Sequence, residues 1–172
     1  MLNPFEIFDL PVDFQLDTQA LNSRYLELQK ALHPDNFVSA SASEQRVAMQ
    51  KSTEVNDALK TLKDPILRAE AIVAIHLGEQ QDIEQKSTQD MAFLMQQLQW
   101  REQLENVERQ KNEQALDALA AEIQQETQQL LTALSHSIQT QQWTQTTQLC
   151  DKLRFTRKLK EEIERVEERF FE

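Results

Sequence analysis

The chain has 172 residues, a formal net charge of −11 at pH 7 and a pI near 4.8, which argues against nucleic-acid binding because such proteins carry a basic face. A lone cysteine excludes a disulfide framework and a zinc-holding cysteine pair, and the longest apolar run, 71–75, is far too short to cross a bilayer. With one glycine and an abundance of glutamine, glutamate, alanine and leucine, the composition predicts a soluble, cytoplasmic, all-α protein.

The first two predicted helices begin at residues that can cap them. Asn3 caps a short helix in which Pro4 suits the first position and Glu6 can complete a capping box. Asp17 caps the second helix. The apolar stripe of this second helix recurs at helical spacing and consists of Leu21, Tyr25, Leu28 and Leu32.

The third and fourth predicted helices meet without a connecting loop. A capping box from Ser41 to Glu44 begins the third helix, and Asp64 and Pro65 supply the cap and first position of the fourth. Gly78 is well placed as the C-terminal cap of the fourth helix. The buried side of the third helix is predicted to consist of Val47, Val55, Ala58, Leu59 and Leu62.

The connection between the second and third helices carries the tripeptide His33-Pro34-Asp35. A residue before proline is pushed out of the right-handed helical region, so the second helix should stop at about His33 and leave two polar side chains on a loop. Taken alone, the tripeptide is equally explained as a helix stop followed by a turn. Arg24 and Lys30 make the second helix locally basic, either as an ordinary solvated face or as part of a binding surface.

A domain boundary is predicted after the fourth helix. Residues 79–87 are polar and lack an apolar period, so we expect a linker there between a first domain at 1–78 and a second at 88–172. Short connections between long helices make them antiparallel neighbours, which predicts an antiparallel three-helix bundle for the second domain. Its helices are expected at about 88–109, 113–140 and 143–171.

The first helix of this bundle carries two apolar stripes, whereas a bundle helix needs only one. The core-facing stripe spans about 60° of the helix and consists of Phe93, Trp100, Leu104 and Val107. The second stripe is centred about 150° away and consists of Met91, Leu94, Met95 and Leu98. Either the fourth helix covers this second stripe or it is an exposed partner surface, for which methionine is well suited. A polar rim continues that face through Gln99, Glu102, Glu105 and Asn106.

The first domain resembles a J domain, the helical module of DnaJ-type co-chaperones. The resemblance rests on the basic second helix, on the tripeptide, and on the stretch 54–65 followed by Arg68-Ala69. Leu32 stands where the family usually has tyrosine, and Asn36 stands where lysine is common, which removes one positive charge. The chaperone-binding residues that the resemblance implies are His33, Pro34, Asp35, Arg24 and Lys30.

The whole chain is similar to the HscB family, the J-domain co-chaperones of iron–sulfur cluster assembly, through the stretches 3–8, 68–70, 92–98 and 152–155. The resemblance implies that the first domain stimulates the ATPase of HscA, a DnaK-type chaperone, and that the bundle delivers the scaffold IscU. Such a protein activates a partner ATPase and is not itself an enzyme. The implied scaffold-binding residues are Leu94, Met95, Leu98, Gln99, Glu102, Asn106 and Phe155, although the family tends to be acidic at the positions of Gln99 and Asn106.

Two other classes of function compete with this interpretation. In an enzyme, His33 and Asp35 would form an acid–base pair, but the sequence near them offers no nucleophile, metal cluster or phosphate loop. Alternatively, the chain is a general J-domain co-chaperone whose bundle binds other clients or dimerises. His76, His136 and Cys150 are scattered and are expected to be structural or exposed, so we predict no catalytic residue, metal site or cofactor.

Overall fold

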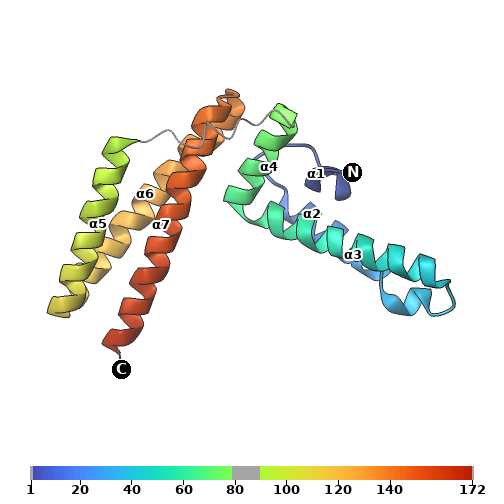
Figure 1. The fold of residues 1–172 in the computed structure, drawn as a ribbon, viewed down its shortest axis with the longest axis horizontal. Helices are drawn as coiled ribbons and strands as arrows, with labels where there is room; N and C mark the ends of the chain where they lie inside the picture. Colours follow the sequence, from blue (N-terminus) through green and yellow to red (C-terminus); the bar gives the residue numbers. More distant parts are fainter. Residues whose placement is uncertain (1, 79–89, 172) are drawn as a thin grey trace. The chain divides into compact units, whose positions relative to one another are not determined.

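The computed structural model describes residues 2–78 and 90–171, and every regular element in these ranges is helical. The all-α class predicted from the sequence is therefore confirmed. The chain divides into two compact units, Met1–Gln80 and Gln81–Glu172, which are coloured blue to green and yellow-green to red in Figure 1. The predicted linker, 79–87, and the predicted start of the fifth helix at 88 lie outside the described residues.

The first unit is built around one long helix, which packs against each of the other helices of the unit (Figure 1). Its elements are α1 (Pro4–Ile7), α2 (Thr18–Ala31), the 3₁₀ helix η1 (Pro34–Phe37), α3 (Ala42–Lys63) and α4 (Pro65–Leu77). The long helix is α3. The most deeply buried large side chains of this unit are Phe5, Phe8, Leu21, Leu62 and Ile72.

Local capping fixes where these helices begin and end. The Ser41 side chain accepts from the backbone N–H of Glu44, whose carboxylate accepts from the backbone of Ser41, which confirms the predicted capping box of α3. Asp64 ends α3 and also caps α4, because its carboxylate accepts from the N–H of Ile66 at 2.9 Å. Gly78 follows α4 with φ of 62°, a left-handed value that favours glycine.

One predicted core position of α3 is wrong. Val47 is 48% exposed, and Ala48 is buried in its place alongside Val55, Ala58 and Leu62. Ala48 precedes Val55 by seven residues and so lies within about 20° of it around the helix, whereas Val47 lies about 80° away. Position around the helix therefore decides which side chain is buried, and not its size.

Arg68 joins α4 to the segment before α2. Its guanidinium donates to the carbonyl of Leu62 at 2.7 Å and lies over the Phe14 ring, 4.7 Å from the ring centroid. Burial lowers the pKa of the Arg68 guanidinium, although the Asp64 carboxylate opposes this shift. This residue, which belongs to the stretch resembling the J domain, therefore has an internal role in the first unit.

The second unit is an antiparallel three-helix bundle, as predicted (Figure 1). Its helices are α5 (Met91–Gln110), α6 (Glu113–Gln139) and α7 (Trp143–Phe170). The α6 and α7 helices pack along each other, and α5 packs against both. The core at the end where α5 packs consists of Trp100, Leu104, Val107, Leu116, Leu119, Ile123, Leu159, Ile163 and Val166.

Candidate functional site

The loop that carries the tripeptide begins as predicted, close to His33. The α2 helix ends at Ala31, and His33 adopts an extended conformation with φ of −60° and ψ of 137°. Its ring nitrogen Nδ1 accepts from the backbone N–H of Asp35 at 3.2 Å, so His33 caps the 3₁₀ turn that Pro34 starts. The imidazole thus holds the shape of the loop on which the Asp35 carboxylate sits.

The carboxylate of Asp35 is open to a partner. Its side chain is 88% exposed, and Nδ1 of His33, on another exposed side chain, lies 3.5 Å from the carboxylate. An ion pair between exposed groups contributes little energy. The carboxylate therefore keeps most of its capacity to accept charged hydrogen bonds from another molecule.

Two amide side chains anchor the loop at its ends. The Asn36 side-chain nitrogen donates to the carbonyls of Lys30 at 2.6 Å and of Ala31 at 3.3 Å, which belong to the last turn of α2. The side chain of Gln45, in the first turn of α3, donates to the carbonyl of Phe37 at 2.9 Å. The Asn36 amide therefore acts as a cap at the carboxyl end of α2.

The two predicted basic residues of α2 do not form one surface. The Arg24 guanidinium is half-buried and donates to the carbonyl of Phe8 at 2.7 Å and to the carbonyl of Asp9. Asp9 has φ of 51°, a conformation that is uncommon outside glycine, and Arg24 binds the carbonyl of this strained turn. Lys30, by contrast, is exposed one turn before the loop.

In the second unit, α5 buries one of its predicted apolar stripes and exposes the other. Trp100, Leu104 and Val107 are buried, whereas the second stripe faces outward. We call this stripe the α5 strip; its members and their exposed fractions are Met91 (64%), Leu94 (40%), Met95 (56%) and Leu98 (63%). Four exposed apolar side chains within two turns of one helix are a recognised mark of a partner surface.

Polar residues continue the α5 strip toward the end of the helix. Gln99, Glu102 and Asn106 are all exposed on α5. The Asn106 carbonyl oxygen accepts from the Arg109 guanidinium at 2.6 Å. The exposed surface of α5 is thus apolar near its start and polar near its end.

Phe155 of α7, the remaining predicted scaffold-binding residue, packs against α5. Its ring stacks on Trp100, with centroids 6.2 Å apart and planes 14° apart, and meets the edge of Phe93 at 5.8 Å. The Arg101 guanidinium lies 5.4 Å from the Phe155 centroid. Phe155 is half-buried in this aromatic group, whereas the other implied scaffold-binding residues are exposed.

The first turn of α5 is held by a pair that sequence reasoning missed. The Asp90 carboxylate caps α5 by accepting from the N–H of Phe93 at 3.0 Å, and Lys152 of α7 lies 2.8 Å from the same carboxylate. The hydrogen bonds from Lys152 and from the Phe93 backbone lower the pKa of the Asp90 carboxyl. Lys152 also lies 5.4 Å from the Phe93 ring centroid. An aspartate just before an apolar run is a cap signal that could have located Asp90.

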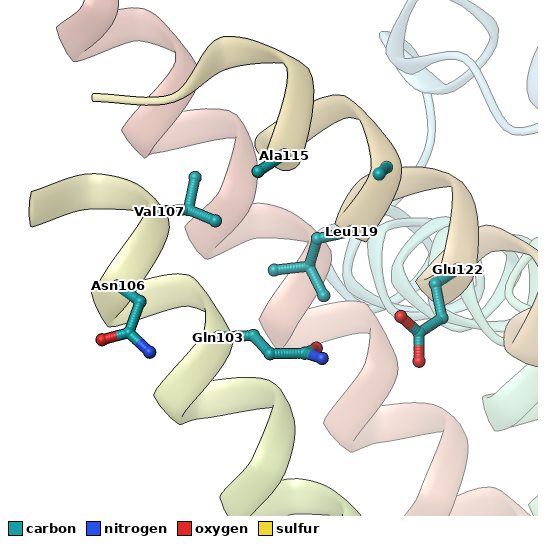
Figure 2. Close-up of a pocket in the computed structure, with 7 residues that line it drawn as sticks. Gln103, Asn106, Val107, Ala115, Leu119 and Glu122 are labelled. Carbon is teal, nitrogen blue, oxygen red and sulfur yellow. The ribbon is translucent and has the colours of Figure 1, made fainter. Parts of the chain in front are cut away.

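A groove of about 290 Å³ runs between α5 and α6 (Figure 2). Its floor is apolar and comes from Val107, Ala115, Ala118 and Leu119, and its rim is polar and comes from Gln103, Asn106 and Glu122. Figure 2 shows the Gln103 side chain extending along the groove from α5, with the Glu122 carboxylate on α6 at one end. Sequence reasoning missed this groove, because it depends on how two helices pack.

Within residues 2–78 and 90–171, no cluster of histidine, cysteine, aspartate and glutamate is suited to hold a metal ion. No helix in the same ranges has the length and apolar character needed to cross a membrane. Cys150, the single cysteine of the sequence, is buried and forms no disulfide.

Comparisons with known proteins give one consistent result. The family model described as "HSCB C-terminal oligomerisation domain" matches residues 89–164. The chain is 77% identical over 172 residues to a co-chaperone protein HscB homolog of Haemophilus influenzae, covering 100% of this chain and 99% of that relative. A homolog of the same name from Pasteurella multocida is 61% identical over 171 residues, or 99% of each chain.

A solved structure agrees with the sequence matches. The chaperone HscB from Vibrio cholerae superposes with a TM-score of 0.86 at 37% identity, covering 98% of this chain and 99% of that one. The fold predicted from the sequence, a J domain followed by a three-helix bundle, is therefore confirmed.

Proposed function

Because the chain belongs to the HscB family of J-domain co-chaperones, we propose that it stimulates the ATPase of an HscA-like, DnaK-type chaperone and delivers an IscU-like iron–sulfur scaffold protein to it. In this proposal the first unit binds the chaperone through the His33-Pro34-Asp35 loop and Lys30. The second unit binds the scaffold through the α5 strip and the polar residues Gln99, Glu102 and Asn106.

The observation that carries the proposal is the exposed, anchored loop. The Asn36 amide ties the start of the loop to α2, and the side chain of Gln45 ties the carbonyls of residues 37 and 40 at its end to α3. Pro34 also restricts the backbone of the loop. Little conformational entropy is therefore lost when a partner binds. Asp35 then offers an exposed carboxylate that can pair with an arginine of the chaperone.

This activity requires no catalytic group in the chain itself. The chaperone carries the groups that hydrolyse ATP, and a co-chaperone that binds one of its conformations more tightly shifts the population toward that conformation. The required feature is a higher affinity for one chaperone conformation than for the other. A rigid loop supports such binding because it loses less conformational entropy than a mobile loop does. The proposed scaffold-binding surface on the second unit would bring the scaffold protein to the same chaperone.

The first arm of the test concerns the loop. Asp35→Asn keeps the shape of the side chain and removes its charge, so we expect single-turnover ATPase stimulation of the chaperone to fall at least tenfold, about 1.4 kcal/mol. Asp57→Asn, an exposed aspartate on α3, is the matched control and should stimulate normally. His33→Gln should resemble Asp35→Asn. Full stimulation by a folded Asp35→Asn protein, checked by circular dichroism, would refute the role of the loop.

The second arm concerns the scaffold. Leu98→Ala truncates a 63% exposed side chain of the α5 strip and should weaken binding of the purified scaffold protein about tenfold, as expected if Leu98 is one of the few residues that carry most of the binding energy. Leu26→Ala, on α2 and 54% exposed, is the control and should bind normally. If the native protein binds unrelated unfolded chains as well as it binds the scaffold, the general co-chaperone alternative is the better description.

A further inference from the structure

Building on the scaffold-binding role proposed above, we propose that the α5–α6 groove is a second contact of that surface and receives a lysine or arginine side chain of the scaffold protein. The family resemblance does not implicate the groove as a whole. Of the residues that line it, Asn106 alone is among those that the resemblance implies.

The floor of the groove suits an aliphatic chain. Val107 of α5 and Leu119 of α6 are core residues that nevertheless line the groove, and the other apolar side chains that α6 adds are the short alanines Ala115 and Ala118. Because these alanine side chains are short, a volume of about 290 Å³ stays open between the two helices. Lysine and arginine place their methylene stems along such apolar surfaces while the charged head remains in polar surroundings.

One end of the groove suits a cation. The Glu122 carboxylate accepts from the indole N–H of Trp100 at 3.1 Å, which orients it at the groove (Figure 2). A carboxylate has about four acceptor positions, so it can still accept strong charged hydrogen bonds from a partner. The rim amides add carbonyl acceptors, and Asn106 already accepts from a guanidinium, that of Arg109 on the same helix.

The groove is continuous with the proposed scaffold surface. Asn106 belongs to both, and it lies eight residues after Leu98, which is about 12 Å along α5. The four side chains of the α5 strip make a small surface, whereas a stable interface buries about 800 Å² on each partner. A partner that lies along α5 from the strip to Asn106 therefore reaches the mouth of the groove.

Filling the groove tests its occupancy. Ala118→Leu places a branched side chain on the groove floor. We expect scaffold binding, measured by calorimetric titration of the full-length protein, to weaken at least fivefold. Ala121→Leu makes the same change at an exposed position of α6 that does not line the groove, and it should bind within twofold of the native protein.

Removing the charge tests the chemistry and remains informative if Ala118→Leu does not fold. Glu122→Gln keeps the side-chain shape and an acceptor for Trp100, so the core should be unaffected. We expect scaffold binding to weaken at least threefold and to depend less steeply on salt. Asp117→Asn, an exposed acidic residue elsewhere on α6, should change neither quantity.

The Leu98→Ala variant separates the two proposals. Normal binding by Glu122→Gln and by any folded Ala118→Leu protein, together with weak binding by Leu98→Ala, overturns the groove contact and leaves the proposed function in place. If the native protein does not bind the scaffold at all, both proposals fail. If Glu122→Gln weakens scaffold binding and Asp117→Asn does not, the groove contact is supported.

Discussion

Individual side chains of α2 and of the His33-Pro34-Asp35 loop divide into those that build the first unit and those that remain exposed. Arg24 and Lys30 illustrate the division. They are both basic residues of α2, but Arg24 donates to backbone carbonyls before the helix whereas Lys30 is exposed. Helical spacing alone could not separate the two roles, because the carbonyls that Arg24 binds lie fifteen and sixteen residues away in the sequence.

We expect single substitutions to separate these roles. Arg24→Ala removes charged hydrogen bonds and should lower the free energy of unfolding by roughly 1–2 kcal/mol. Lys30→Ala should change stability by less than about 0.5 kcal/mol but slow association with the chaperone, as added salt should do for the native protein. Urea denaturation and stopped-flow binding measure the two quantities. Equal stability of the two variants would contradict this division.

Asn36 gives a second prediction at the residue scale. Asn36→Asp replaces the amide donor at the end of α2 with a carboxylate that faces carbonyl oxygens, and it should destabilise the first unit by about 1–2 kcal/mol.

Asn112 provides the matched control. Its side-chain oxygen accepts from the N–H of Ala115 at the start of α6, where aspartate caps equally well. Asn112→Asp should therefore change stability by less than about 0.5 kcal/mol. Urea unfolding of both variants measures the contrast, and a similar loss in both would show that Asn36 is not acting as a helix cap.

Among the helices, those whose ends carry local signals were the most predictable. The junction at Asp64 and Pro65 and the capping box at Ser41 depend on residues within four positions of one another, and the predicted ends agree with the structure. The position of Phe155 of α7, in contrast, depends on a distant helix, α5. Contacts with Phe93 and Trp100 decide its position, and a single sequence does not contain that information.

The pair that fixes the start of α5 gives a prediction at the scale of this element. Lys152→Met keeps an apolar chain over Phe93 but removes the ion pair with Asp90, so amide hydrogen exchange in the first two turns of α5 should accelerate. Because these turns carry the α5 strip, scaffold binding should weaken a few-fold. Lys160→Met, at an exposed position on α7, is the control.

The same pair predicts a dependence on pH. The pKa of Asp90 is lower in the folded protein than its ordinary value, so its charged form stabilises the fold above the ordinary pKa. This contribution is lost as the pH falls through the lowered pKa. The difference in stability between the native protein and Lys152→Met should therefore be present at neutral pH and disappear in acid. A difference that persists at the lowest pH would contradict the role of the Asp90 charge.

At the scale of the whole molecule, two units with separate cores carry two separate proposed surfaces. We therefore expect a substitution in one surface to leave the function of the other surface unchanged. Asp35→Asn should leave the affinity for the isolated scaffold protein within twofold, and Leu98→Ala should leave ATPase stimulation without scaffold unchanged. Calorimetric titration and single-turnover hydrolysis measure the two effects on each variant. Loss of both activities in either variant would contradict this separation.

The arrangement of the first unit around α3 has a consequence for synthesis of the chain. The α1 and α2 helices leave the ribosome first, yet α3, against which both pack, lies at residues 42–63. At translation rates of 5–20 residues per second, its 22 residues take roughly one to four seconds to emerge. For that interval Phe5, Phe8 and Leu21, which are buried in the folded unit, lack the helix that covers them. We therefore predict that α1 and α2, before α3 has emerged, are a transient substrate for chaperones that bind exposed apolar residues.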